Sequence, residues 1–252
     1  MPRFLATLAF DGGLYHGWQI QPNRPTVQEE LEKVLALLNK EAVRVYGAGR
    51  TDSGVHGWGQ HAAFNMNDDW TSRQLTLALN AHLPQGITVR HLRPCPEGFD
   101  PRTAAKWRTY RYFIWQDSTC PTYLRPYVWW RKGKSWQQEL AFWGWKAYQG
   151  RHDFLAFCKS GEAPENTLRT LFSLQCRKKG SLWVFSVRGQ SFLMNMVRAM
   201  IGTLDSLCRG HITKEEFLAL LEGAERKDGG PTAPPSGLFF WRVGYHRRSG
   251  LE

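Results

Sequence analysis

The chain has 252 residues, enough for one large or two small cored domains, and its 42% hydrophobic and 22% charged residues are ordinary for a folded globular protein. This composition excludes a disordered chain. Lysine and arginine outnumber aspartate and glutamate by 33 to 22, giving a formal net charge of +11, which favours a polyanion such as nucleic acid as partner over a charge kept only for solubility.

The first hundred residues predict alternating strands and helices. An apolar run at residues 4–10 predicts a strand, and Asp11-Gly12-Gly13 predicts the turn after it. Thr26 and Glu29 form a capping box before a helical apolar pattern, which predicts an amphipathic helix over residues 27–39. Further strands are expected at residues 44–48, 60–64 and 87–92, with a helix that begins at Thr71 and closes before Pro84.

A glycine-rich segment, GAGRTDSGVHGWGQ at residues 47–60, lies between two of these strands. Glycine accepts a positive φ and lets another group come close, so this segment predicts a tightly turned loop beside a bulky partner. Asp52 stands in it near Arg50, and an Asp beside a cation stays ionised at neutral pH, available as nucleophile, base or electrostatic anchor. Taken alone, the segment is also compatible with a surface turn that holds an ion pair.

Other sites built on glycine-rich loops or histidines fit this segment poorly. A phosphate-binding Walker loop needs Gly-Lys-Ser/Thr, which is absent here. Residues 57–62 match a loosened dinucleotide fingerprint, but an apolar run follows where a helix should begin. His56 and His61 have no Cys or Glu at a metal-ligand spacing, so no metal is expected.

The second half opens with a strand at residues 105–115, which places Arg108, Tyr110, Tyr112 and Ile114 on one face. Ser135 and Gln138 are expected to open a helix that runs to Gly150, with Leu140, Trp143 and Ala147 on its apolar stripe. His152-Asp153-Phe154 is expected to begin a loop that packs on Phe157. Residues 171–187 predict a hairpin that turns at Lys179-Gly180-Ser181.

A helix is predicted over about residues 192–208, and its buried stripe consists of Met196, Val197, Met200, Ile201 and Leu204. Asn195 and Arg198 lie three residues apart on another flank, so Arg198 is able to face a cleft. A short helix begins at Thr213, and residues 238–243 supply a final strand. Two α+β halves are therefore expected, residues 1–104 and residues 105–252.

Cellular location and redox state follow from absences in the sequence. The N-terminus lacks the apolar core of a signal peptide, and no run of 18 apolar residues occurs, so a cytoplasmic protein that makes no membrane contact is expected. The five cysteines are scattered and odd in number, which suits reduced thiols and indicates neither a disulfide framework nor a zinc site.

Five ordered motifs resemble those of the TruA-type tRNA pseudouridine synthases. The segment from Gly49 to Gln60 closely resembles the catalytic motif G-R-T-D-x-G-V-H-x-x-G-Q, and residues 108–112 (RTYRY) look like the family's R-x-Y-x-Y strand. Residues 190–198 (QSFLMNMVR) are similar to its arginine-bearing helix, and residues 231–238 (PTAPPSGL) to its C-terminal signature. Residues 15–19 (YHGWQ) and the helix start at Thr26 also fit the opening segment of the family. The similarity covers nearly the whole chain in order.

The resemblance implies an α+β fold of two ferredoxin-like halves related by a pseudo-twofold, with antiparallel-rich sheets that meet at a central basic cleft. It implies isomerisation of uridine to pseudouridine in the anticodon stem-loop of tRNA by a homodimer, with neither a metal nor an organic cofactor. An extruded nucleotide in a closed pocket suits this chemistry, because the base must be detached, turned and rejoined without escaping.

The resemblance also implies a role for four residues. Asp52 is the catalytic carboxylate, which adds to the uracil ring, attacks the anomeric carbon or removes a sugar proton; the sequence does not choose among these routes. Tyr110 stacks on the target base and assists proton removal from its 5-carbon, and Arg198 pairs with the catalytic carboxylate. Arg50 intercalates or touches phosphate as the nucleotide flips, with a structural ion pair as the alternative.

The chain departs from the family pattern at three positions, and two other functions remain open. Ser53 stands where the family usually carries Ala, and Trp58 and His61 replace smaller or apolar residues, which affects the shape of the pocket. The alternatives are a catalytically idle RNA-binding module of the same fold and a metal-free nuclease that uses His152 and Asp153.

Overall fold

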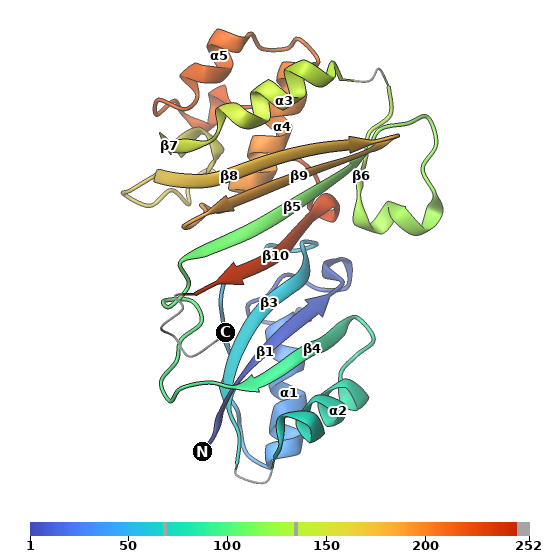
Figure 1. Cartoon of the computed structure of the whole chain (residues 1–252), viewed down its shortest axis with the longest axis vertical. Coiled ribbons are helices and arrows are strands. Elements are labelled where there is room, and N and C mark those ends of the chain that lie inside the picture. Colours follow the sequence, from blue (N-terminus) through green and yellow to red (C-terminus); the bar gives the residue numbers. More distant parts are fainter. Residues whose placement is uncertain (68–69, 134–135, 246–252) are drawn as a thin grey trace. The chain divides into compact units, whose positions relative to one another are not determined.

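The computed structural model describes residues 1–67, 70–133 and 136–245, and the chain divides into two compact units (Figure 1). The first unit comprises Met1–Trp107 and the chain from Phe239 onward, and the second comprises Arg108–Leu238. The last strand thus belongs with the first unit, whereas the sequence placed residues 105–252 together. Both units mix helices with mostly antiparallel strands, the coarse fold class that the sequence predicts.

The first unit contains β1 (Arg3–Phe10), α1 (Val27–Asn39), β2 (Tyr46–Gly47), β3 (His56–Asn65), α2 (Ser72–His82), β4 (Ile87–Pro94) and β10 (Leu238–Gly244), with a 3₁₀ turn at Gly12–Leu14. Its strand order is β4-β1-β3-β10, and β2 also pairs with β3. β1 pairs antiparallel with both β3 and β4, whereas β10 runs parallel to β3. The loop that carries Asp52 joins β2 to β3.

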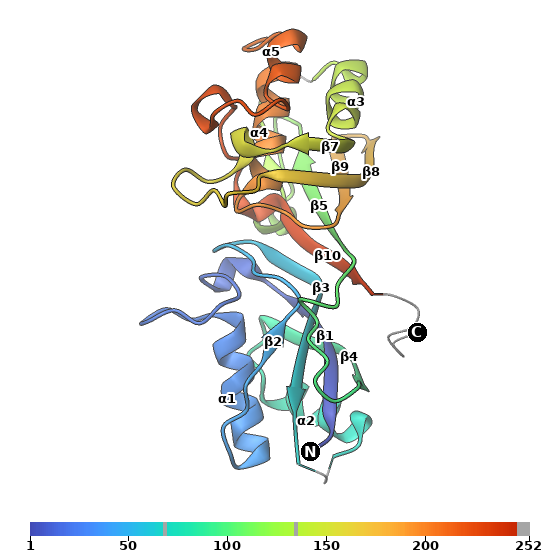
Figure 2. The same cartoon turned by 90° about the vertical axis from the view of Figure 1, so that its left-hand side faces the viewer.

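One face of this sheet is covered by α1 and α2 (Figures 1 and 2). Their apolar stripes pack with side chains of β1, β3 and β4 into one buried cluster that includes Phe4, Leu8, Leu31, Phe64 and Leu79. The cap residues Thr26 and Thr71 begin these helices as expected, each accepting a backbone hydrogen bond from the third residue after it. Burial of this stripe, together with the caps, fixes where both helices lie.

The second unit contains β5 (Trp107–Trp115), β6 (Trp129–Trp130), α3 (Gln138–Ala147), β7 (Gly150–Asp153), β8 (Leu168–Lys179), β9 (Leu182–Gly189), α4 (Met196–Cys208) and α5 (Lys214–Ala219), with 3₁₀ turns at Thr122–Tyr127, Leu155–Phe157, Arg226–Asp228 and Pro235–Gly237. Its strand order is β5-β9-β8-β7, antiparallel throughout, and β6 pairs parallel with β5. The hairpin at Gly180 is confirmed, with φ of +56° at that glycine.

The structure corrects two helices of the second unit. The buried face of α3 consists of Ala141, Gly144 and Trp145 rather than Leu140, Trp143 and Ala147. A Cβ on Gly144 would come within 2.7 Å of Leu204, so the small residues let α4 approach on that side. Gln137 is the N-cap of α3, and Ser135, expected to open it, lies outside the described residues. α4 begins at Met196, later than the expected 192, although its predicted stripe is buried.

Two strand predictions also change. The strand expected at residues 44–48 is reduced to Tyr46–Gly47, and β3 begins at His56 rather than at residue 60. His152 and Asp153 end the short strand β7 instead of beginning a loop. The His152 ring contacts the Gln149 carbonyl, and Asp153 accepts a hydrogen bond from the Leu155 amide, so both side chains have local structural partners.

Candidate active site

The loop that carries Asp52 is held against the segment that follows β1. The Trp18 amide donates to the Thr51 carbonyl oxygen at 3.1 Å, and the Gly54 amide donates to the Tyr15 carbonyl oxygen at 3.4 Å. A Cβ on Gly17 would lie 2.5 Å from the Thr51 carbonyl oxygen, and φ at Gly17 is +92°. The backbone on each side of Asp52 is therefore fixed by contacts that only a glycine at position 17 permits.

Most glycines of this segment are needed because neighbouring groups pack closely against them, and only one is needed for a positive φ. Of the five in residues 47–60, only Gly54 has a positive φ, +79°. Gly57 and Gly59 lie inside β3, where a Cβ would meet the Phe10 ring at 2.3 Å and the Trp241 carbonyl oxygen at 2.5 Å. The expectation of a tightly turned loop across this whole segment is thus wrong after Val55, where the chain is already a strand.

Two motif side chains brace the loop from inside the first unit. Gln60 is fully buried, and its Nε2 donates to the Gly49 carbonyl oxygen at 2.6 Å. His56 is 1% exposed, accepts a hydrogen bond at Nδ1 from the Gly12 amide and stacks on Phe239 with ring centroids 4.6 Å apart. These contacts explain why the motif carries a Gln and a His there: both support the loop without being part of the exposed surface.

Asp52 itself is half-buried, and its carbonyl oxygen accepts a hydrogen bond from the Val55 amide at 3.1 Å, which forms the turn after it. Its neighbour Arg50 is exposed. Among the described residues, Thr51 Oγ1 and His16 Nδ1 are buried without a hydrogen-bond partner. A buried polar atom without a hydrogen bond costs roughly 1–3 kcal/mol, and these two atoms lie on the segments that meet beside Asp52.

In the second unit, Tyr110 lies on β5 opposite Val187 of β9. Its half-buried ring packs edge-to-face with the Phe192 ring, with the ring centroids 4.9 Å apart and the ring planes at 76° to each other. Arg108, two residues earlier on β5, donates from Nη1 to the Gln190 carbonyl oxygen at 3.1 Å. The strand that carries Tyr110 is thereby attached to the segment that leads into α4 and Arg198.

Arg198, in the first turn of α4, is held in place by two acceptors. Its Nε donates to the Ala233 carbonyl oxygen at 2.8 Å, and its Nη1 donates to Asn195 Oδ1 at 2.9 Å. Asn195 adopts φ of +62° at the N-cap of the helix, a conformation that Asn tolerates better than most residues. The expected proximity of Asn195 and Arg198 is therefore a direct hydrogen bond, and the guanidinium plane has a fixed orientation.

The segment after α5 is the second support of Arg198. A Cβ on Gly202 would lie 1.6 Å from the Pro231 carbonyl oxygen, so this segment packs directly on α4. The buried Tyr112 donates from its hydroxyl to the Pro234 carbonyl oxygen at 2.7 Å. Burial raises the pKa of Tyr112 well above its usual value, and the positive charge of Arg198 acts in the opposite direction. Tyr112 is thus a neutral hydrogen-bond donor that anchors the segment.

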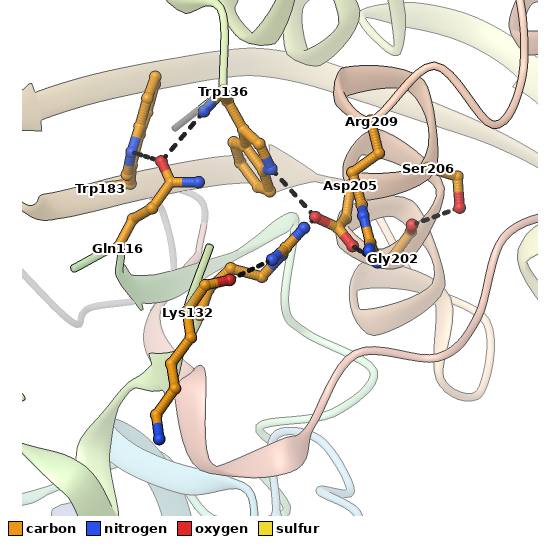
Figure 3. Close-up of polar contacts among 9 residues, drawn as sticks. Gln116, Lys132, Trp136, Trp183, Gly202, Asp205, Ser206 and Arg209 are labelled. Atoms are coloured by element: carbon orange, nitrogen blue, oxygen red, sulfur yellow. Dashed lines mark hydrogen bonds and ion pairs between the residues drawn. The ribbon is translucent and has the colours of Figure 1, made fainter. Parts of the chain in front are cut away.

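A buried polar network fixes the far end of α4 (Figure 3). Asp205 accepts hydrogen bonds from Arg131 Nε at 2.6 Å and from Trp136 Nε1 at 3.0 Å. Both donors belong to the chain between β5 and α3, and Figure 3 shows the Trp136 indole pointing toward Asp205. Gln116 accepts from Trp183 Nε1 at 3.0 Å and from the Trp136 amide at 3.3 Å. Because Asp205 lies two turns after Arg198, this network keeps α4 from shifting along the sheet.

The structure thus brings Tyr110 together with the segment before Arg198 in the second unit, and it places Asp52 and Arg50 on one braced loop in the first. Sequence reasoning missed the supporting residues Gln60, Phe192, Ala233 and Asp205. Gln60 was quoted within the motif and so carried a signal; the Ala233 carbonyl carries none, because every residue has one.

Within residues 1–67, 70–133 and 136–245, no group of three or more His, Cys, Asp or Glu side chains is arranged to hold a metal ion. None of the helices in that part of the chain combines the length and the apolar character that crossing a membrane requires.

Comparisons with known proteins agree on one family. The family model for tRNA pseudouridine synthase matches residues 6–102 and 145–246. A tRNA pseudouridine synthase A from Geobacillus kaustophilus is 36% identical over 247 residues, covering 96% of this chain and 94% of the relative. Another from Agrobacterium fabrum is 38% identical over 248 residues, covering 97% and 93%. A solved Cbf5-Nop10-Gar1 complex matches with a TM-score of 0.37 and 11% identity over 95% of this chain and 58% of that one, too distant to support any argument.

Proposed function

The chain belongs to the tRNA pseudouridine synthase family, and we propose that it isomerises uridine to pseudouridine in the anticodon stem-loop of tRNA with Asp52 as the catalytic carboxylate. The observation that carries the proposal is the bracing of the Asp52 loop from three sides, by Gly17-Trp18, Gln60 and His56. A carboxylate that only decorates a surface turn does not need buried side chains to hold its backbone.

The isomerisation conserves every atom and the overall oxidation level of the nucleoside. The bond between the anomeric carbon and N1 of uracil breaks, the base turns, and a bond from the same carbon to C5 forms. The proton lost from C5 is balanced by one gained at N1, so the proposal includes no redox or group-transfer cofactor. Asp52 starts the sequence by adding to the ring, attacking the anomeric carbon or removing a sugar proton.

Three further residues complete the proposal. The family resemblance implies that the Arg198 guanidinium pairs with the Asp52 carboxylate, and the fixed orientation of Arg198 on Ala233 and Asn195 suits that role. Tyr110 stacks on the extruded base and assists the proton loss from C5, with Phe192 at its edge. Flipping the nucleotide out of the RNA stack costs a few kcal/mol. The exposed side chain of Arg50 offsets this cost by contacting a phosphate or by intercalating where the nucleotide was stacked.

The larger arrangement is proposed on the same grounds. The first unit follows the order strand, helix, two strands, helix, strand up to β4. The chain from β5 to β10 contains the same order with β6, β7 and α5 added, which is compatible with two ferredoxin-like halves of residues 1–104 and 105–252. The family model also matches the chain in two stretches, one in each proposed half. A pseudo-twofold, a basic cleft and a homodimer complete the proposal through family resemblance, and a cytoplasmic location completes it through the sequence features given above. Light scattering of the purified chain tests the homodimer.

The experiment is to incubate unmodified tRNA transcripts with the wild-type chain and map pseudouridine by carbodiimide adducts. The wild type should modify uridines in the anticodon stem-loop, and Asp52→Asn should lower the rate by about a thousandfold or more while binding tRNA equally well. Ser53→Ala is the matched control, because it alters the exposed neighbour of Asp52 and should keep the rate. Wild-type protein that binds the transcripts without modifying any uridine would disprove the proposal.

A further inference from the structure

A hollow of about 180 Å³ opens on the first unit beside the Asp52 loop. It begins at Gly49 and Arg50 and extends between Arg44, Tyr46 and Arg102. The indole of the buried Trp18 forms part of its lining, and a Cβ on Gly47 would lie 2.6 Å from that indole. The wall is therefore tightly packed, and the three arginines, all exposed, line it from different segments.

The charges of this hollow are unbalanced. Arg44 and Arg50 form no ion pair with any carboxylate in the described part of the chain. The acidic lining residue, Asp100, uses Oδ1 to accept from the backbone amides of Arg102 and Thr103. By formal charge the lining carries three arginines and one carboxylate, and this net positive charge favours an anion.

The size and the aromatic contact narrow the class of anion. A volume of about 180 Å³ is below the roughly 300–1,000 Å³ of pockets that hold drug-sized molecules, so a small group is favoured over a whole nucleotide. The Tyr46 ring is already in contact with two guanidiniums, Arg3 at 5.2 Å and Arg44 at 5.5 Å. Its face orients Arg44 instead of offering a platform for a base.

We infer, on the basis of the proposed function, that this hollow is a subsite for one backbone phosphodiester of the substrate RNA, read by Arg44 and Arg102 next to Arg50. It holds the strand at a fixed distance from the nucleotide presented to Asp52. Arginine suits this task because its planar fork donates two parallel hydrogen bonds to phosphate oxygens.

The test compares Arg44→Ala with Arg73→Ala, which removes the same charge from an exposed position on α2 outside the hollow. Affinity for a tRNA transcript is measured at several salt concentrations on the full chain, after circular dichroism has shown that both variants are folded. Arg44→Ala should bind about tenfold more weakly, and the slope of log affinity against log salt should fall by about one. Arg73→Ala should match the wild type. Equal affinities and slopes for the two variants would overturn the inference.

A second arm identifies the phosphate. Anticodon stem-loops with one neutral methylphosphonate at successive positions are titrated against the wild type and Arg44→Ala. One position should weaken wild-type binding and leave Arg44→Ala unaffected, because the contact is already lost; the absence of such a position counts against the subsite. Failure of the proposed function is seen separately, as a wild type that binds tRNA and forms no pseudouridine.

Discussion

Arg198 donates from its Nε to the carbonyl oxygen of Ala233 at 2.8 Å, and the Ala233 amide in turn donates to the Arg198 carbonyl oxygen at 3.1 Å. This reciprocal pair joins the first turn of α4 to the segment after α5. It leaves the side chain few rotamers, and a guanidinium that is already oriented loses little further entropy when it holds a carboxylate.

Removing the Arg198 side chain should therefore reduce catalysis more than binding. Arg198→Ala should lower turnover at saturating tRNA by about a hundredfold, the factor that corresponds to about 3 kcal/mol for an ion pair broken on one side. Arg198→Lys keeps the positive charge but not the planar guanidinium, so its turnover should lie between those of the wild type and Arg198→Ala. Asn195→Gly is the matched control: it keeps the positive φ and removes only the contact to Nη1. Single-turnover rates and tRNA affinities measure both effects, and an unchanged turnover in Arg198→Ala would contradict the role.

A methyl group at position 202 of α4 should displace the segment whose Ala233 carbonyl oxygen holds Arg198. Gly202→Ala places a Cβ 1.6 Å from the Pro231 carbonyl oxygen, so the segment that offers the Ala233 carbonyl to Arg198 must move. We expect a loss of about 2 kcal/mol in the free energy of unfolding, with a lower turnover. Urea denaturation and the pseudouridine assay measure these. Ser206→Ala, one turn later on α4, removes a hydroxyl that donates to the Gly202 carbonyl and should leave turnover unchanged.

The buried carboxylate of Asp205 should be essential to stability. Its side chain is 7% exposed and that of Arg131 is 11% exposed, so Asp205→Leu leaves a nearly buried cation without its partner. The expected loss is about 3–5 kcal/mol, whereas the double variant Asp205→Leu/Arg131→Met should lose less than either single one. Urea denaturation of the four proteins gives the cycle, and Glu139→Gln on the exposed start of α3 is the control. Additive losses would show that the two charges do not depend on each other.

Acid should destabilise the first unit through His61. Burial, with a smaller contribution from Arg93, lowers the pKa of His61 to about 4 from 6.5. The unfolded chain therefore binds a proton that the folded chain does not, and stability present above pH 6.5 is lost as the pH falls toward 4, by about 3 kcal/mol at most. Denaturation curves at pH 7.5 and pH 4.5 should show this loss in the wild type and less of it in His61→Gln. The same loss in His61→Gln as in the exposed His82→Gln control would assign the effect to other groups.

Much of the local structure can be predicted from the sequence. Thr26, Thr71 and Thr213 each cap a helix where the spacing of the following apolar residues requires one, because capping and amphipathic burial depend on residues within a few positions of each other. The α4 stripe is buried as predicted for the same reason. The family was recognised from the resemblance of five ordered motifs to known ones, and that resemblance also implies Asp52 as the catalytic residue, a role that stays a proposal.

The tertiary structure decided which of two possible faces of α3 is buried. It also decided which groups distant in the sequence form hydrogen bonds around the candidate site. On α3, two apolar stripes have helical spacing, and only the closeness of α4 selects the one with Ala141 and Gly144. The contact of Gln60 with Gly49 and that of Arg198 with Ala233 join positions 11 and 35 residues apart, and their backbone acceptors have no sequence signature. Local order is encoded by neighbours along the chain, whereas the support of the candidate site depends on packing, which brings together groups that no spacing rule connects.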